Sequence, residues 1–291
     1  MYKMPNFASK DNAIIKPIKH PQIPMAENYP VRWFDVTDST NNRILADRGN
    51  LPEGAVYAAL FQSAGRGQRG NSWKSSSGLN LTFTILLRPV ALPAAEQFAI
   101  SEAVTLGITD YLLAKGVEAR IKWPNDIYCG DRKICGILIE NSLSGDKLAD
   151  SVIGIGLNLN QKEFDPSAPN PTSLTLQTGL SYSLEEELQL LLDRIFKRCK
   201  LLEEPSAALL DSLGKDYLGR LYRLGGWYDF IDCRASGDTL TPTTVAIEGE
   251  RFTGRIKGLA PGGLLRIERK AEGNKDGEAI DFAFKELRYI I

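Results

Sequence analysis

The chain has 291 residues, of which 43% are hydrophobic and 24% are charged, and its formal net charge is -1. This composition is typical of a soluble globular protein with one large domain and a smaller one. A nearly neutral chain has no diffuse positive field to hold a polyanion by counterion release, so we expect no nucleic-acid partner.

Residues 1–29 show no hydrophobic periodicity, and we expect them to form a flexible leader. They lack the apolar centre of a secretory signal, and no apolar run in the chain reaches the roughly 20 residues that a membrane span needs. We therefore predict a cytoplasmic protein with no membrane partner. His20 is the only histidine, so neither a histidine-based catalytic triad nor a histidine-ligated metal site is expected. The four cysteines lack metal-ligand spacing and are expected to be reduced thiols.

Apolar runs and alternating patterns bounded by turn residues predict strands. These are residues 31–36, 55–62, 79–87, 118–126 with a break at Pro124, and 151–160. Residues 127–140 are predicted to form two strands joined by a turn at Gly130–Asp131.

Three stretches predict helices. A short helix is capped by Ser39 or Thr40 and ended by Gly49. Residues 94–114 carry one apolar stripe, and residues from about 184 to 203 combine such a stripe with capping-box spacing at the start.

After about residue 216 the pattern changes to short strands separated by glycines. The strands are predicted at residues 243–250, 252–260, 263–270 and 279–290. A small β-barrel of about 60 residues follows from this pattern. We therefore divide the chain into a leader at 1–29, an α+β domain at 30–215 with a mixed, mostly antiparallel sheet packed with helices, and a C-terminal barrel at 216–291.

The stretch QSAGRGQRGNSWKS, residues 62–75, joins two predicted strands and is rich in glycine and arginine. Its glycines allow backbone N–H groups to approach a ligand closely, and Arg66 and Arg69 supply charges suited to a carboxylate or phosphate. The stretch matches neither a P-loop nor a dinucleotide-binding fingerprint. A mobile surface loop with incidental arginines is the alternative interpretation.

A second polar cluster lies in KWPNDIYCGDRKICG. Pro124 stops a predicted strand and places Asn125 and Asp126 at the strand end, and the following hairpin returns Lys133 towards the same end of the sheet. These side chains are therefore expected to converge on one cavity, where a partly desolvated lysine charge acts more strongly. The alternative is that Lys133 is a solvated residue flanking a buried strand.

The segments DSTNN, QSAGRGQRGNSW, KWPNDIY, DRKICGILIE and GIGLNLN occur in the order and spacing seen in biotin protein ligases. The sequence resembles this family over residues 31 to about 160. The resemblance implies a biotin/lipoate ligase-like catalytic domain at 30–215 with a C-terminal SH3-like barrel. It also implies biotin and ATP as substrates, Mg²⁺ as the accompanying ion, and a biotin carboxyl carrier protein domain as the partner. Only about thirty residues precede the first strand, so the form without a DNA-binding domain is expected.

The resemblance also implies roles for individual residues. Those implied to bind biotin are Ser39, Thr40, Gln62, Gly65, Arg66, Lys133 and Gly136. Those implied to bind ATP or the adenylate are Arg69, Trp73, Asn158 and Lys133. Lys133 and Arg66 are also the expected catalytic cations, and Asp126 is the candidate for orienting or deprotonating the incoming lysine. A structural role for Asp126 in the hairpin is the alternative.

Physical chemistry gives these roles a reason. Attack of a carboxylate on the α-phosphate of ATP brings two anions together, so cations and amides placed in advance lower the barrier. Gln68 and Asn71 stand where many family members have basic residues, so a less cationic phosphate clamp is expected. A lipoate ligase and a binding module without catalysis are the alternatives. Exposed sheet edges would also allow a homodimer, although no sequence pattern identifies its interface.

Overall fold

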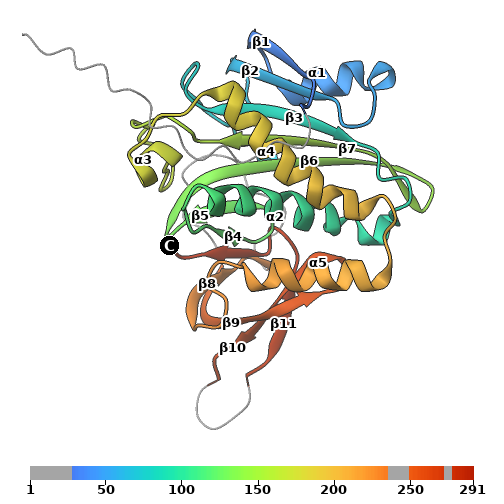
Figure 1. Ribbon diagram of the computed structural model, residues 1–291. Coiled ribbons are helices and arrows are strands. Elements are labelled where there is room, and N and C mark those ends of the chain that lie inside the picture. The colour runs from blue at the N-terminus through green and yellow to red at the C-terminus, as the bar shows by residue number, and fades with distance from the viewer. Residues whose placement is uncertain (1–27, 235–248, 272–276) are drawn as a thin grey trace, which may run out of the picture.

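The computed structural model describes residues 28–234, 249–271 and 277–291, without the side chain of Arg69. Most of the expected leader, and residues 243–248 of an expected strand, therefore lie outside the described residues. Within these ranges the chain forms a seven-stranded sheet with helices, followed by a five-stranded sheet at the C-terminus (Figure 1).

The main sheet has the strand order β1-β2-β3-β7-β6-β5-β4. The strands are β1 Val31–Thr37, β2 Val56–Gln62, β3 Leu81–Leu87, β4 Arg120–Lys122, β5 Asp126–Cys129, β6 Arg132–Ser144 and β7 Lys147–Leu157. β1 and β2 are parallel, and every other neighbouring pair in this sheet is antiparallel. The predicted α+β class with a mixed, mostly antiparallel sheet is confirmed.

The α-helices of the described residues are α1 Thr40–Asp47, α2 Phe98–Ala114, α3 Leu174–Thr178, α4 Leu184–Cys199 and α5 Ala207–Gly219. α2 and α4 pack against each other along one face of the main sheet (Figure 1). Their close approach requires Gly107, because a Cβ atom there would lie 2.6 Å from the Cα atom of Ile195. None of the described helices is long and apolar enough to cross a membrane.

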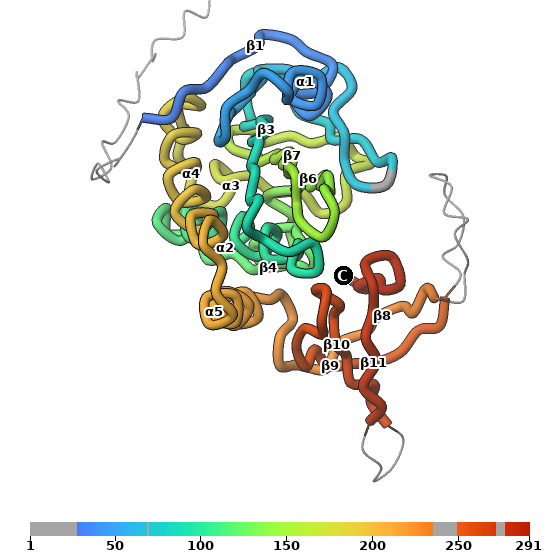
Figure 2. Tube along the Cα trace, turned by 90° about the vertical axis from the view of Figure 1, so that its right-hand side faces the viewer, coloured from blue at the N-terminus to red at the C-terminus, as the bar shows by residue number. Residues whose placement is uncertain are grey.

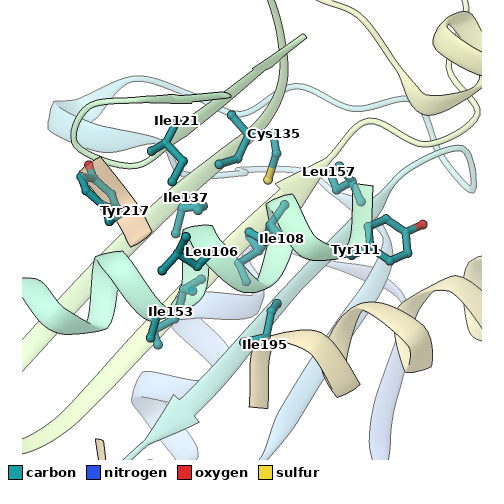
Figure 3. Close-up of a cluster of buried hydrophobic side chains, with 14 of the residues drawn as sticks. Leu106, Ile108, Tyr111, Ile121, Cys135, Ile137, Ile153, Leu157, Ile195 and Tyr217 are labelled. Atoms are coloured by element: carbon teal, nitrogen blue, oxygen red, sulfur yellow. The ribbon is translucent and has the colours of Figure 1, made fainter. Parts of the chain in front are cut away.

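The main core lies between these two helices and the sheet. Figure 3 shows Leu106 and Ile108 of α2 among Ile137 and Ile153 of the sheet, and all four are buried. Burial of this apolar layer supplies the main driving force that holds the helices on the sheet.

The opposite face of the sheet carries α1, which contacts β2, β3 and β7. Apolar and polar residues alternate at the start of β3, yet all of Leu81–Leu87 is buried. Both buried hydroxyls have hydrogen-bond partners: Thr82 donates to Ala59 O, and Thr84 Oγ1 lies 2.7 Å from Thr40 Oγ1 and from Asn41 Oδ1 of α1. α1 ends at Asp47, so Gly49 lies in the following 3-10 turn and does not end the helix as predicted.

The C-terminal sheet has the order β11-β10-β9-β8-β12 and all its neighbouring pairs are antiparallel. Its strands are β8 Tyr228–Asp232, β9 Glu250–Ala260, β10 Leu264–Arg269, β11 Ala279–Phe282 and β12 Leu287–Tyr289. This second sheet is consistent with the predicted SH3-like barrel. The proposed domain boundary after residue 215 falls within α5, which leads from the main domain towards β8.

Candidate active site

Three glycines create a flat floor at the centre of the main sheet, on the face that carries α1. Gly136 of β6 is paired with Gly156 of β7, and Gly154 lies two residues earlier in β7. A Cβ atom at Gly156 would overlap the indole ring of Trp73, and one at Gly136 would lie 2.8 Å from Trp73 Cζ3. The absence of side chains therefore lets other groups lie directly on the backbone of the sheet.

A cavity of about 360 Å³ lies over this floor, within the size range of pockets that hold small molecules. Figure 2 shows the sheet with α2 and α4 on one side and the loop that follows β2 on the other. The predicted site residues that line the cavity are Ser39, Thr40, Gln62, Arg66, Trp73, Asp126, Lys133 and Gly136. The structure thus brings the glycine-arginine loop and the KWPND hairpin to one cavity, as the sequence analysis expected.

One end of the cavity is a buried polar cluster between the start of α1 and the end of β2. The Gln62 Oε1 atom accepts hydrogen bonds from Thr40 N at 2.7 Å and from Thr40 Oγ1 at 3.1 Å. Ser39 and Thr40 are each 2% exposed. Ser39 precedes α1, but its hydroxyl does not cap the helix. Gln62 instead accepts from Thr40 N, one of the free N–H groups at the helix N-terminus. The Thr40 hydroxyl and the Gln62 amide, which offer both donors and acceptors, are therefore held in fixed positions.

Two of the cations that line the cavity, Arg66 and Lys133, are each paired with a carboxylate. Lys133 Nζ lies 2.8 Å from Asp126 Oδ1, and both side chains are 26% exposed. Arg66 binds Glu140 with both terminal nitrogens, at 2.7 and 3.0 Å. The Lys133 ammonium also lies 5.7 Å from the centre of the Trp73 ring, within the range of a cation–π contact. The site therefore presents two ordered positive groups to an anionic ligand.

The turn that carries Asp126 is fixed from behind by two helices. The carbonyl oxygen of Pro124 accepts hydrogen bonds from Ser101 Oγ of α2 at 2.9 Å and from Tyr217 Oη of α5 at 2.8 Å. Asn125 is buried and donates to Ile137 O at 3.0 Å. The Asn125 side chain thus binds the backbone of β6, whereas Asp126 lines the cavity.

Among the lining residues that the sequence analysis missed are Lys122, Phe284 and Arg288. Burial lowers the pKa of Lys122, and the neighbouring Asp126 carboxylate opposes this shift. Lys122 pairs directly with Asp126 in the β4–β5 ladder, so its place before WPND was a usable signal. Arg288 lies in β12 of the C-terminal sheet and Phe284 in the turn between β11 and β12, where no local pattern indicates a contact with the main domain.

Other predicted residues lie outside the lining. Asn158 is buried and donates to Thr172 O at 2.9 Å, which ties the end of β7 to the segment before α3. Gly65 closes the base of the loop, where its carbonyl accepts from Trp73 N at 2.9 Å. The Arg69 side chain is outside the described part of the structure.

Trp73 Nε1 is buried without a hydrogen-bond partner among the described residues, so the indole has an unused donor.

The two positions that depart from the family pattern both line the cavity. Gln68 donates from Nε2 to Ile137 O at 3.2 Å, which fixes the loop to β6. Asn71 accepts at its backbone carbonyl from Gly67 N at 2.7 Å. Gln68 therefore supplies a neutral anchor at this position of the clamp.

Comparison with known proteins gives consistent matches. The model of the biotin/lipoate A/B protein ligase family matches residues 33–158. A bifunctional ligase/repressor BirA of Salmonella typhimurium is 33% identical over 245 residues, which cover 82% of this chain and 69% of that protein. A biotin--[acetyl-CoA-carboxylase] ligase of Paracoccus denitrificans is 40% identical over 53% of this chain and 67% of its own length. The structure of a biotin protein ligase from Aquifex aeolicus in complex with biotin and ATP covers 89% of this chain and 99% of that one, with a TM-score of 0.67 and 25% identity.

Proposed function

Since this chain is an enzyme of the biotin protein ligase family, we propose that it activates biotin with ATP and transfers it to a carrier protein. The observation that carries the proposal is the meeting of Arg66 and Lys133 at one cavity above a glycine floor. These two cations come from segments that are far apart in the sequence. Their convergence provides a place where two anions can be held together.

Biotin would bind with its ureido ring at the buried polar end of the cavity. A ureido group has two N–H donors and one strong acceptor, so its burial requires partners of both kinds. Ser39 and Thr40 hydroxyls and the Gln62 amide supply these partners. The Trp73 indole lies on Gly136 and Gly156, so the flat bicyclic ring would reach the glycine floor when Trp73 moves aside, and the carboxylate would point towards the cations.

In the first step, an oxygen of the biotin carboxylate attacks the α-phosphorus of ATP. A bond from this oxygen to phosphorus forms, the bond to the bridging oxygen breaks, and pyrophosphate leaves. Lys133 and Arg66 reduce the repulsion between the two anions and stabilise the charge on the phosphoryl oxygens. Lys122 and Arg288 add positive charge to the same cavity. Trp73 would cover the intermediate, so that water has less access to the mixed anhydride.

Mg²⁺ is part of the proposal because it usually binds through one or two carboxylates together with substrate phosphates. Asp126 is the only carboxylate among the described residues that line the cavity, so the residues present fit an ion held mainly by the nucleotide. When bound, the ion would neutralise charge on the leaving pyrophosphate.

In the second step, the neutral amine of a carrier lysine attacks the carbonyl carbon of biotinyl-adenylate. An amide bond forms, AMP leaves with the electron pair of the broken C–O bond, and the amine loses a proton. Asp126, which lines the cavity, would orient the amine and accept this proton. The anhydride is already activated, so no nucleophile from the enzyme is needed. We propose a biotin carboxyl carrier protein domain as the acceptor.

The proposed function can be tested with purified protein, Mg·ATP, labelled pyrophosphate and one acid at a time. Biotin should support exchange of the label into ATP, whereas lipoate and octanoate should not. A second assay adds a biotin carboxyl carrier domain and measures its mass, which should increase by one biotinyl group. Exchange with lipoate or octanoate but not with biotin would overturn the substrate assignment. Biotin binding without any exchange would favour a module that has lost catalysis.

A further inference from the structure

Arg66 binds Glu140 of β6 with two hydrogen bonds and Asn42 of α1 with one, at 3.1 Å to Asn42 Oδ1, although Glu140 is not among the described residues that line the cavity. Arg66 donates from Nη2 to Glu140 Oε1 at 2.7 Å and from Nη1 to Glu140 Oε2 at 3.0 Å. This pair joins the loop after β2 to a strand 74 residues further along the chain. Resting on the proposed function, we propose that Glu140 is a positioning residue that holds Arg66, and with it the loop, over the reaction intermediate.

The Glu140 carboxylate is itself anchored by a buried side chain. Asn41 donates from Nδ2 to Glu140 Oε2 at 3.0 Å, and Asn41 is 4% exposed. The Asn41 Oδ1 atom accepts from Thr84 Oγ1 at 2.7 Å. Asn41 also lies directly over Gly154, where a Cβ atom would overlap its amide oxygen. Asn41 is therefore fixed by packing and by both ends of its amide, so Glu140 has a rigid neighbour.

The same chain of hydrogen bonds reaches the polar end of the cavity. The Thr84 and Thr40 hydroxyl oxygens lie 2.7 Å apart, and Thr40 N donates to Gln62 Oε1 at 2.7 Å. Groups implied to hold the biotin ring are thus linked to Arg66 through Thr84, Asn41 and Glu140. A ligand that orders Thr40 and Gln62 would also favour the arrangement that orients Arg66.

The Arg66–Glu140 pair should stabilise the loop more than an ordinary ion pair on the protein surface does. Arg66 and Glu140 side chains are 39% and 29% exposed, and single exposed ion pairs usually contribute little. Two features make this pair stronger, namely the two parallel N–H···O bonds and the anchored acceptor. Both reduce the side-chain freedom that is lost when the pair forms. Glu140 should therefore lower the fraction of time that the loop spends away from the cavity.

The test compares the full chain with Glu140→Gln, Arg66→Ala and the double variant, and measures release of biotinyl-adenylate from the enzyme in a rapid-quench or filter assay. Glutamine has the shape of glutamate but removes the charge. Glu140→Gln should accelerate release by about fivefold or more. If Glu140 acts through Arg66, the double variant should release the adenylate as fast as Arg66→Ala alone, within about twofold.

A matched control is available on the C-terminal sheet. Arg266 and Asp281 form another two-bond pair, with both distances 2.7 Å and side chains that are 46% and 32% exposed. Asp281→Asn removes the same kind of interaction far from the loop, so it should leave the release rate unchanged. A general effect of losing a surface ion pair would appear in this control as well.

A second readout does not depend on the enzymatic reaction. In ligand-free protein, Glu140→Gln should increase the rate of trypsin cleavage after Arg66, measured by mass spectrometry, because the loop is less often held at the sheet. Unchanged cleavage together with unchanged adenylate release would overturn the role of Glu140 while leaving the ligase assignment intact. Additive effects in the double variant would also overturn it. If the unsubstituted chain forms no adenylate, the proposed function fails and the role in retention fails with it.

Discussion

Lys133 and Asp126 form an ion pair across the β5–β6 hairpin, with the lysine Nζ 2.8 Å from Asp126 Oδ1. The ladder explains how the two side chains meet. Ile127 pairs with Cys135, but Tyr128 pairs with Lys133, so β6 contains one extra residue at this point. Such a bulge changes the direction of neighbouring side chains, and bulges are common beside active sites. Lys133 is thereby directed to the cavity that also contains Asp126.

Lys133→Ala should lower biotin-dependent pyrophosphate exchange by on the order of 10²-fold or more, because it removes a charge that stabilises the phosphoryl transition state. The circular dichroism spectrum should not change, since the side chain is partly exposed. Lys215→Ala is a suitable control, because Lys215 pairs with Asp211 on the exposed surface of α5. A loss smaller than threefold in the Lys133 variant would contradict its role.

Asp126→Asn separates the two proposed roles of Asp126. If the carboxylate receives the proton of the carrier lysine, transfer from preformed biotinyl-adenylate should slow by on the order of 10²-fold, and pyrophosphate exchange should fall by less than about tenfold. Single-turnover transfer and exchange are measured on the same preparation. Equal losses in both assays would indicate that Asp126 only holds Lys133 and the hairpin in place.

Arg66→Ala should accelerate the escape of biotinyl-adenylate by about tenfold, because the loop loses its charged contact with the intermediate. Release is measured by quenching after adenylate formation in the absence of a carrier. The exchange rate at saturating biotin is recorded in parallel as a check on folding and chemistry. Unchanged release would contradict the interpretation of this loop as a lid.

Glu102 of α2 predicts a pH dependence of stability. The side chain is 7% exposed, and burial, with a contribution from Glu96, raises its pKa from 4.5 to about 7. Below pH 4.5 the group is neutral in both the folded and the unfolded chain. As the pH rises from there to 7, the unfolded chain loses the proton first, so the free energy of unfolding falls by on the order of 3 kcal/mol in total.

Glu102→Gln removes this ionisation. The melting temperature of the variant should exceed that of the natural sequence by at least a few degrees at pH 8, whereas the two should be nearly equal at pH 4.5. Thermal unfolding followed by circular dichroism at both pH values provides the comparison. The same difference in melting temperature at both pH values would show that packing, not ionisation, separates the two proteins.

Much of the main sheet could be predicted, because its signals are local. The Gly130–Asp131 turn and the apolar runs on either side gave the β5–β6 hairpin, and Gly130 has a positive φ of 55° as a tight turn requires. The helix from Leu184 to Cys199 was also predicted, and the Ser183 hydroxyl accepts from Glu186 N as capping-box spacing indicates.

Other features depend on tertiary contacts that no local pattern contains. α5 was missed, since Gly214 and Gly219 weaken the helical signal and only Leu213 and Tyr217 are buried. Arg288 was missed as a site residue because it reaches the cavity from a separate sheet. Glu140 was missed for a similar reason, since its partner Arg66 lies on another segment of the chain.

The central claim is that one cavity, between Arg66 and Lys133 and above the glycine floor, holds both biotin and the adenylate. A crystal structure with a non-hydrolysable analogue of biotinyl-adenylate tests it most directly. The account predicts the ureido ring beside Thr40 and Gln62, with the phosphoryl group within hydrogen-bonding distance of the Lys133 ammonium. Density for the analogue at another place, or cations directed away from it, would contradict the account.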